Sequence, residues 1–435
     1  MYRPRSHVHD SVTIIKSPQN ITYITSVRKN RAAACAAFSF PRVVDELFVC
    51  FFAPIVGMTG PASVVVTPLA GRSARRAFWA LPQRLYQNDP HWVPPLQLER
   101  HELLSARNPL FEHARVQAWL AWRGNEVVGR ISAQVDRLHE QTHGERVGYF
   151  GLLEAEDDPA VFAALLGTAE TWLRGQGMTE VRGPFNLSVN EECGLLVDGF
   201  DTPPMVMMGH ALPYYAPRIE AEGYAKAKDL LAYIVDADFQ FSPAAQRVLD
   251  RERGKVSLRP VDFRHLDRDI AILRDIFNEA WAGNWGFVPF TEAEFKALGQ
   301  LVRWLVDPGF VQIAEVAGEP VAMIAVLPNI NEAIADLNGR LLPFGWAKLL
   351  WRLKVRHPKG VRVALMGVRQ GLQRTRLGTA LAMLVIDAAR QTGLRRGVRQ
   401  AEMSWILEDN RGMRSIIESL GSRCYKRYRV YGKAL

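Results

Sequence analysis

The sequence has few cysteines and lacks a long apolar run. Its cysteines are scattered along 435 residues with no paired spacing, which predicts neither a disulfide framework nor a zinc site; they are Cys35, Cys50, Cys193 and Cys424. The apolar run at residues 47–57 has 11 residues, well short of the roughly 20 that a membrane-spanning helix requires. These absences favour a protein of the reducing cytoplasm with no bound metal.

The overall composition is that of an ordinary globular protein. Apolar residues make up 48% and charged residues 23% of the chain, which is typical of a protein with a buried core. A chain of 435 residues has room for more than one domain. The net charge of +9 suits an anionic lipid, a nucleic acid or a phosphate-bearing cofactor equally well.

Residues 1–57 are expected to lie outside the fold. They contain seven Lys or Arg residues and three acids, and the basic residues lie far from the apolar run, which argues against a secretory signal. Ordinary domain patterning begins at Met58. We therefore interpret residues 1–57 as a disordered leader or a translated upstream stretch.

The predicted elements occur twice in the same order. In the first part, a strand and helices precede a hairpin formed by Val116–Trp122 and Glu126–Val135, and strand, helix, strand, helix and strand follow. The second part repeats this order from Val256 to the end. We therefore predict an α/β fold with a mixed sheet, built as two tandem units at residues 58–240 and 255–435.

A strand, a short loop and a helix in the second unit form a predicted anion site. Val361–Val368 has the alternation of a strand, and apolar residues recur at helical spacing from Leu377. The loop between them carries Gln373, Arg374 and Arg376. Free backbone N–H groups and the positive end of the helix dipole meet at such a point, so we expect it to bind a phosphate.

This stretch resembles the signature of the GNAT acyltransferases, V-x-P-x-Y-R-G-x-G-I-G-x-x-L. Val368, Gln373, Leu377, Gly378 and Leu381 fall on its Val, Arg, Ile, last Gly and Leu. Two arginines of the loop replace signature glycines and would bring side-chain charge to the phosphates. The resemblance implies a second unit that binds acyl-CoA as a co-substrate, with no permanently bound cofactor. The implied binding residues are Gly367, Val368, Gln373, Arg374, Thr375, Arg376, Leu377, Gly378, Thr379 and Asn410.

The resemblance continues through Trp405–Asn410 and a helix that ends at Leu420 and Gly421. The family places an asparagine beside the pantetheine arm, and Asn410 occupies that position. Where many members carry a tyrosine that protonates the leaving thiolate, this chain has Ile417. The usual general acid is therefore absent or is supplied by another residue.

Several side chains are candidates for the acid and base of the reaction. Glu332 follows the hairpin of the second unit and Glu408 ends the next strand, so both are candidate bases. Tyr425 or Tyr428 would replace the missing acid. Each of these residues also has an interpretation as a surface carboxylate or a packed tyrosine.

The first unit carries acids where the second carries its basic loop. Glu154, Glu156, Asp157 and Asp158 follow its corresponding strand, and these carboxylates would repel a pyrophosphate. We expect the first unit to cover the acceptor side of the second without binding coenzyme A. In its proline-rich stretch 88–96, the aromatic residues at 91 and 92 either touch a ligand or pin the loop to the core.

An insertion at residues 337–360 separates the second unit from a plain acetyltransferase. It has six Lys or Arg residues and no acid. A helix from Pro343 would place Lys348, Arg352 and Arg356 on one stripe, with apolar and tryptophan residues on the remaining surface. This composition is typical of a helix in a membrane interface. The alternative is a helix buried between the units with its basic stripe exposed.

The leading functional hypothesis is an acyl-CoA-dependent N-acyltransferase. The tandem architecture and the insertion look similar to the GNAT-type bacterial ceramide synthases, which would make a long-chain acyl-CoA the donor and a sphingoid base the acceptor. The alternatives are acetylation of a small or peptide amine and a non-catalytic protein that binds coenzyme A or lipid. The C-terminal stretch has a strand's alternation, which argues against a basic tail for nucleic acid. The expected location is the cytoplasm, with peripheral binding to the inner membrane face if the insertion is interfacial.

Overall fold

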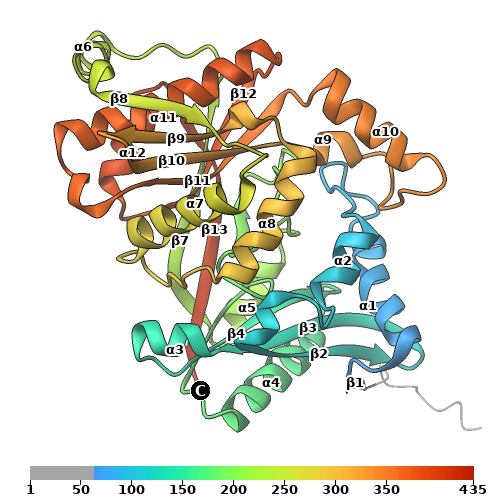
Figure 1. The fold of residues 1–435 in the computed structure, drawn as a ribbon. Helices are drawn as coiled ribbons and strands as arrows, with labels where there is room; N and C mark the ends of the chain where they lie inside the picture. Colours follow the sequence, from blue (N-terminus) through green and yellow to red (C-terminus); the bar gives the residue numbers. More distant parts are fainter. Residues whose placement is uncertain (1–62) are drawn as a thin grey trace, which may run out of the picture. The chain divides into compact units, whose positions relative to one another are not determined.

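The computed structural model describes residues 63–435 (Figure 1). The predicted leader, residues 1–57, and the start at Met58 lie outside the described residues. The strands are β1 (Val64–Pro68), β2 (Ala114–Arg123), β3 (Glu126–Asp136), β4 (Val147–Ala155), β5 (Glu180–Gly183), β6 (Leu195–Asp198), β7 (Ala225–Asp236), β8 (Val256–Pro260), β9 (Val311–Val316), β10 (Glu319–Pro328), β11 (Gly360–Val368), β12 (Gln400–Leu407) and β13 (Arg423–Ala434). The helices are α1 (Gly71–Leu85), α2 (Gln97–Leu103), α3 (Arg137–His143), α4 (Pro159–Gly175), α5 (Tyr215–Ala221), α6 (Pro243–Glu252), α7 (Leu266–Trp281), α8 (Glu292–Leu305), α9 (Ile330–Ile334), α10 (Gly345–Trp351), α11 (Arg376–Arg395) and α12 (Arg411–Glu418).

The strands join in one mixed sheet of 13 strands, in the order β1-β2-β3-β4-β5-β13-β7-β12-β11-β10-β9-β8, with β6 paired to β13. The two halves of the chain exchange their closing strands in this sheet. β7, from the first half, pairs with β12 and β13 of the second, and β13 also pairs with β5 of the first (Figure 1). The mixed α/β sheet that the sequence predicts is confirmed, and its centre is built from both halves.

A separate hydrophobic core supports each half of the sheet. In the first half, α4 buries one face that includes Leu165, Leu166 and Leu173, all without exposed surface. In the second half, α11 packs Leu381 and Val385 into a core shared with α7 and strands β9 to β11. Burying each such side chain stabilises the fold by about 1.5–3 kcal/mol. These helices therefore hold the strands of each half in place around the site.

Two neighbouring strands separate partway along their length. β11 and β12 are paired in parallel only from Gly360 opposite Gln400 to Val363 opposite Met403. Beyond this point β11 continues to pair with β10 as far as Val368, and β12 continues along β7. Backbone groups on the facing edges of β11 and β12 are therefore left without strand partners, next to the predicted anion site.

The insertion carries a short helix whose apolar side chains are mostly exposed. α10 begins at Gly345 and continues into a π-helical turn at Arg352–Arg356. Only Leu349 and Leu353 are buried, so the alternative of a helix buried between the units is wrong. The exposed apolar residues of the insertion are Leu342, Phe344, Trp346, Leu350, Trp351 and Val355.

The basic stripe of the insertion differs from the sequence prediction because of a neighbouring acid. Lys348 and Arg352 both pair with Asp336, at N–O distances of 2.5 Å. The remaining four cations of the insertion, Arg340, Lys354, Arg356 and Lys359, have no carboxylate partner within residues 63–435. In the same part of the chain, no helix is long and apolar enough to cross a membrane.

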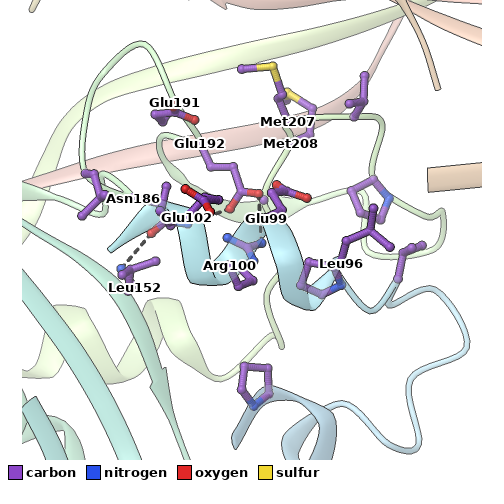
Figure 2. Close-up of a pocket in the computed structure, with 18 of the residues that line it drawn as sticks. Leu96, Glu99, Arg100, Glu102, Leu152, Asn186, Glu191, Glu192, Met207 and Met208 are labelled. Atoms are coloured by element: carbon purple, nitrogen blue, oxygen red, sulfur yellow. Dashed lines mark hydrogen bonds and ion pairs between the residues drawn. The ribbon is translucent and has the colours of Figure 1, made fainter. Parts of the chain in front are cut away.

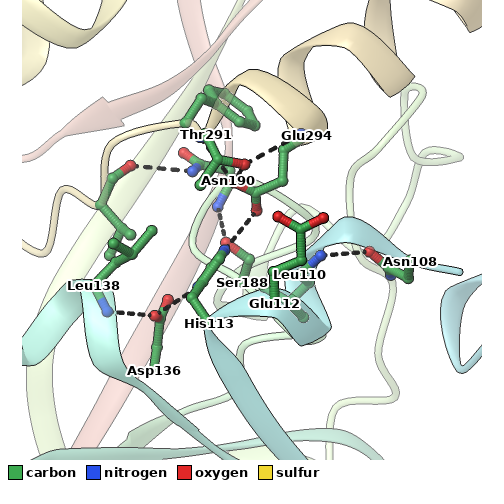
Figure 3. Close-up of polar contacts among 12 residues, drawn as sticks. Asn108, Leu110, Glu112, His113, Asp136, Leu138, Ser188, Asn190, Thr291 and Glu294 are labelled. Carbon is green, nitrogen blue, oxygen red and sulfur yellow. Dashed lines mark hydrogen bonds and ion pairs between the residues drawn. The ribbon is translucent and has the colours of Figure 1, made fainter. Parts of the chain in front are cut away.

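A charged contact links the two halves (Figure 3). His113 precedes β2, and its Nδ1 lies 2.8 Å from the carboxylate of Asp136, at the end of β3. Its Nε2 lies 3.3 Å from the carboxylate of Glu294 in α8. Burial opposes a charge on this ring, but the hydrogen bond to Asp136 and the adjacent carboxylate of Glu294 outweigh it and raise the pKa of His113 to about 9. The ring is therefore a cation at neutral pH.

Candidate active site

The predicted phosphate loop follows β11 and leads into α11. Thr375 caps the helix, because its hydroxyl accepts a hydrogen bond of 2.9 Å from the N–H of Gly378. A Cβ on Gly378 would lie 2.0 Å from the carbonyl oxygen of Leu372, so the position requires glycine. Arg374 has a φ of 63°, in the left-handed region that glycine adopts most easily. The loop therefore keeps the backbone of a glycine-rich loop at a position where the sequence has arginine.

Two cations of this loop are free of acidic partners. Arg374 and Arg376 make no ion pair with any of residues 63–435, whereas Arg369 is held by Asp275 and Glu279. The first-turn N–H groups of Arg376 and Leu377 have no carbonyl acceptor inside the helix. Gln373 stabilises the loop, since its amide donates to the carbonyl of Val368 at 2.9 Å. Positive side chains and a helix N-terminus therefore meet at one point.

A narrow apolar cavity of 110 Å³ lies where β11 and β12 separate. Its walls include Val363 and Met366 of β11, Trp405 of β12 and Ile417 of α12. Ile417 is buried, with 2% exposure. Because its side chain is aliphatic, it supplies no hydroxyl at this position of the wall. Asn410 caps the N-terminus of α12, and its side-chain oxygen accepts from the N–H of Met413 at 3.1 Å. The cavity is lined mainly by apolar side chains and lies between the separated strands, and we call it the slot.

A buried polar cluster borders the slot. Arg362 and Glu402 are 1% and 0% exposed. Ser404 lies between them: its hydroxyl donates to Glu402 at 2.7 Å and accepts from Arg362 at 2.8 Å. Tyr425 donates its hydroxyl to the second oxygen of Glu402. Burial raises the pKa of Glu402 and, with the adjacent carboxylate, that of Tyr425.

The structure places the three predicted catalytic residues in different surroundings. Tyr425 is in the buried cluster, as described. Glu332, in α9, accepts from the backbone N–H groups of Lys359 and Gly360, both at 2.8 Å. Glu408 directly follows β12 and forms an ion pair of 2.6 Å with Lys226. The structure does not bring these residues together, and their catalytic roles stay predictions.

Sequence reasoning missed Arg362 and Glu402. Each alternates with apolar residues along its strand, a pattern that also fits a strand with one solvent-facing side. The only sequence signal is a charge in the middle of an otherwise apolar strand. The pairing of the two charges depends on the parallel register of β11 and β12, where Arg362 lies opposite Glu402.

A second cavity, of 1440 Å³, lies beside this region. It is bounded by α1, α2, α8 and the segment 184–211, and most of its lining is apolar. Figure 2 shows the acidic part of its wall, where Arg100 pairs with Glu192 at 3.2 Å. Burial and the carboxylates of Glu192 and Glu99 raise the pKa of Glu191 to about 7. We call this space the large cavity.

The segment 204–211 lines the large cavity and contacts the polar cluster that borders the slot. The carbonyl of Val206 accepts from Arg362 at 3.2 Å, and the sulfur of Met208 lies 3.3 Å from the hydroxyl of Ser404. Both residues also line the large cavity, together with Met207 (Figure 2). A molecule in the large cavity therefore lies next to the polar cluster that borders the slot.

The corresponding loop of the first half has a different charge arrangement. Asp158 caps α4 by accepting from the N–H of Ala160 at 2.8 Å, so a carboxylate already occupies this helix N-terminus. The other acids of the loop are also paired. The ion pairs are Glu154 with Arg130, Glu156 with Arg84 and Arg123, Asp157 with Arg218, and Asp158 with Arg123. The arginines that pair with these acids are therefore not free to bind an anion, in contrast to Arg374 and Arg376.

The duplicated order of elements and the separated strands define the class of protein as a tandem GNAT fold. A tandem GNAT protein from the clavulanic acid biosynthesis pathway matches 86% of this chain and 98% of its own, with a TM-score of 0.51 and 14% identity. A GCN5-related glucosamine N-acetyltransferase region of a fungal β-N-acetylglucosaminidase matches 86% of this chain and 38% of its own, with a TM-score of 0.50 and 14% identity. At this identity the likeness concerns the fold.

Two curated relatives are much closer in sequence. Protein YghO of Escherichia coli (strain K12) is 50% identical over 372 residues, 85% of this chain and 95% of the relative. The bacterial ceramide synthase of Caulobacter vibrioides is 48% identical over 377 residues, 86% of this chain and 98% of the relative. No family model matches the chain. The chain belongs to the family of these two proteins, and the predicted resemblance to GNAT-type bacterial ceramide synthases is confirmed.

Proposed function

We propose that this protein is an N-acyltransferase that transfers a long-chain acyl group from acyl-CoA to a long-chain amine of the sphingoid type. The observation that carries the proposal is the large cavity. Its 1440 Å³ exceeds the range of about 300–1,000 Å³ of most small-molecule pockets. An apolar lining with carboxylates on one wall suits a molecule with a long chain and a cationic head. The membership of this chain in a family that includes a ceramide synthase supports the same assignment.

The acyl-CoA donor would bind across the second half. Arg374 and Arg376, with the N-terminus of α11, would hold the phosphates. The slot would take the pantetheine arm and the thioester. N–H groups on the unpaired edge of β11, at residues 364–368, would pair with the amides of that arm and stabilise the oxyanion of the tetrahedral intermediate. Acyl-CoA is in this scheme a substrate and leaves after each turnover.

Peripheral binding to an anionic lipid surface is part of the proposal. α8 and the insertion expose apolar residues that include Trp304, Trp346 and Trp351, at 70%, 52% and 51% exposure. Unpaired cations of the same insertion complement an anionic headgroup layer. Leu301 of α8 lines the large cavity and is also 57% exposed. A long-chain amine could therefore pass from the lipid surface into the cavity along one apolar path.

An assay of chain length tests the function. The purified protein is incubated with acyl-CoA substrates from acetyl to palmitoyl, with and without sphinganine or a small amine, and thiol release and amide product are measured. We expect thiol release that depends on both a long acyl chain and a long-chain amine. Preference for acetyl-CoA with a small amine would instead favour a short-chain acetyltransferase. Binding of acyl-CoA with no thiol release under any condition would favour a non-catalytic protein.

A further inference from the structure

A histidine of the segment 204–211 is held by an aspartate from the proline-rich stretch of the first half. His210 lines the large cavity, and its side chain is 4% exposed. Its Nε2 lies 2.8 Å from Oδ2 of Asp89. The other oxygen of Asp89 accepts from the N–H of His91 at 2.8 Å, which fixes the orientation of the carboxylate. The imidazole is therefore held from one side only.

The contact with Asp89 determines which ring nitrogen carries the proton. An ionised carboxylate accepts hydrogen bonds and donates none, so Nε2 of His210 carries the hydrogen and Nδ1 presents a lone pair. Nδ1 is buried and has no hydrogen-bond partner within residues 63–435. Burial lowers the pKa of His210, although Asp89 acts in the opposite direction; the other charged groups facing the ring are Lys426 and His91. The ring is neutral at pH 7 and has a free acceptor nitrogen.

Aromatic contacts keep this part of the first half in place. Tyr86 lies with its ring centre 5.8 Å from that of His210 and stacks on Trp92 at 5.3 Å. The hydroxyl of Tyr86 also bonds to Glu154 at 3.0 Å. The proline-rich stretch, whose aromatic residues had two interpretations from sequence, is thus pinned beside the ring. A rigid support of this kind keeps a base in one orientation.

The segment that carries His210 lines the large cavity and also contacts residues at the edge of the slot. Met208, two residues earlier, touches Ser404 at the edge of the slot, and Val206 accepts a hydrogen bond from Arg362. His210 thus belongs to a segment that lines the large cavity and contacts the polar cluster beside the slot. His210 therefore lines the space proposed for the amine and lies two residues from the contact with Ser404 at the edge of the slot.

We propose that His210, oriented by Asp89, is the base that accepts the proton of the attacking amine. This inference rests on the proposed function and adds a catalytic residue from the first half, which the sequence resemblance assigned no chemistry. Asp89 is a positioning residue, because it acts through His210.

The reaction balances without any further reactant. The neutral amine nitrogen bonds to the thioester carbon, and the carbonyl electron pair moves to oxygen. As the new C–N bond forms, the nitrogen becomes acidic and its proton passes to Nδ1 of His210. The carbonyl then re-forms while the C–S bond breaks and its electron pair leaves on sulfur. The imidazolium returns the proton to the thiolate, so amine and acyl-CoA become amide and free thiol.

Substitution of the histidine and its partner tests the proposal. Palmitoyl-CoA and sphinganine are the probes, and amide formation is measured from pH 5.5 to 9 for wild type, His210→Gln and Asp89→Asn. We expect kcat of His210→Gln to fall by about 100-fold or more, with unchanged palmitoyl-CoA affinity. The kcat of Asp89→Asn should fall by about 10-fold or more, because a side-chain amide can also donate to Nε2 and so stabilise the tautomer with hydrogen on Nδ1. The acid limb of the pH–rate profile of Asp89→Asn should move to lower pH, since Asp89 raises the pKa of the ring.

A second histidine provides the matched control. His139 is 1% exposed and neither ring nitrogen has a hydrogen-bond partner among the described residues 63–435, but it does not line the large cavity. His139→Gln should keep kcat within about threefold of wild type. If His210→Gln does not fold, Asp89→Asn with its pH profile decides. Amide formation by His210→Gln at the wild-type rate, or an unmoved acid limb in Asp89→Asn, would overturn the role of His210 alone. A wild type that forms no amide would overturn the proposed function instead.

Discussion

At the scale of single residues, the loop before α11 shows how charge can replace glycine. Arg374 keeps the left-handed φ of 63°, and Gly378 remains because the carbonyl of Leu372 leaves no room for a Cβ. A non-glycine residue at positive φ is strained. The strain is understandable if the guanidinium binds the phosphates of acyl-CoA, since the gain in charge then offsets the cost in backbone conformation.

Charge reversal in this loop should weaken the binding of acyl-CoA. We expect Arg374→Glu or Arg376→Glu to raise the Kd about tenfold or more, because a loss of 1.4 kcal/mol is sufficient. Titration of coenzyme A at several salt concentrations measures the effect, and the difference from wild type should shrink as salt rises. Arg399→Glu is the control, since Arg399 is exposed in the same half and lies after α11. An equal loss in all three variants would mean that net charge, and not this loop, attracts the ligand.

The hydroxyl of Tyr425 can be tested against a structural equivalent. Tyr425 donates to Glu402 beside the slot, and Tyr431 donates to Glu220 at 2.8 Å. Replacing either tyrosine by phenylalanine removes one hydrogen bond to a carboxylate, worth about 1.5–3 kcal/mol. If Tyr425 protonates the thiolate, only Tyr425→Phe should lower thiol release per folded molecule. Melting curves and single-turnover thiol assays distinguish the two effects, and equal activity in both variants would leave Tyr425 a structural residue.

At the scale of elements, α10 combines a buried anchor with an exposed apolar surface. Leu349 packs with α9 and lines the large cavity, whereas Trp346 and Trp351 are more than half exposed. Asp336 pairs with both Lys348 and Arg352 and cancels one of their two positive charges, so most of the attraction to anionic lipid comes from the other cations of the insertion. The element is therefore fixed to the fold by a few residues and leaves its largest side chains free for a lipid surface.

Substitutions on α10 should separate lipid binding from stability. Trp346→Ala with Trp351→Ala should change the free energy of unfolding by no more than about 0.5 kcal/mol per site and release the protein from anionic vesicles. Lys354→Glu with Arg356→Glu should weaken the same binding by about 1 kcal/mol per residue or more. Leu349→Ala is the contrasting variant, with a cost of about 2–5 kcal/mol from the cavity that it leaves. A wild type that does not sediment with anionic vesicles at low salt would disprove the interfacial role.

At the scale of the whole molecule, charged and hydrogen-bonded contacts tie one half to the other. β7 and β13 cross the sheet between the halves, and the ring of His113 is clamped between Asp136 and Glu294. Glu294 also lines the large cavity. Glu294 therefore contributes both to the wall of the large cavity and to the contact between the halves.

The clamp predicts how stability depends on pH. The pKa of His113 is raised to about 9 in the folded protein, from about 6.5 in an unfolded chain. Its stabilising contribution is therefore complete below about pH 6.5 and is lost as the pH rises through about 9. Urea unfolding of wild type and His113→Gln at pH 6, 8 and 9.5 measures this. We expect the variant to be less stable by roughly 3–5 kcal/mol at pH 6, because a buried and a partly buried carboxylate lose their cation, and the difference should shrink at pH 9.5. A difference that does not change with pH would show that the ring is neutral.

The sequence by itself determined the local elements and the character of the second half. The strand at 361–368, the loop with its arginines, the helix after it and Ile417 in place of a tyrosine are all readable from periodicity and spacing, because each depends on residues close together in the chain. These features were sufficient for the family resemblance. They were also sufficient for the difference between the basic loop of the second half and the acidic loop of the first.

Only the tertiary structure decided which distant residues meet. The exchange of β7 and β13, the opposition of Arg362 and Glu402, and the contact of His210 with Asp89 join residues that are far apart in the sequence. Periodicity tells that a strand has a buried face but not which strand lies beside it, since many pairings satisfy the same pattern. A charge inside an apolar strand therefore looks like a solvent-facing residue until its partner is known. For this reason, the sequence alone did not predict the polar groups beside the slot and the large cavity.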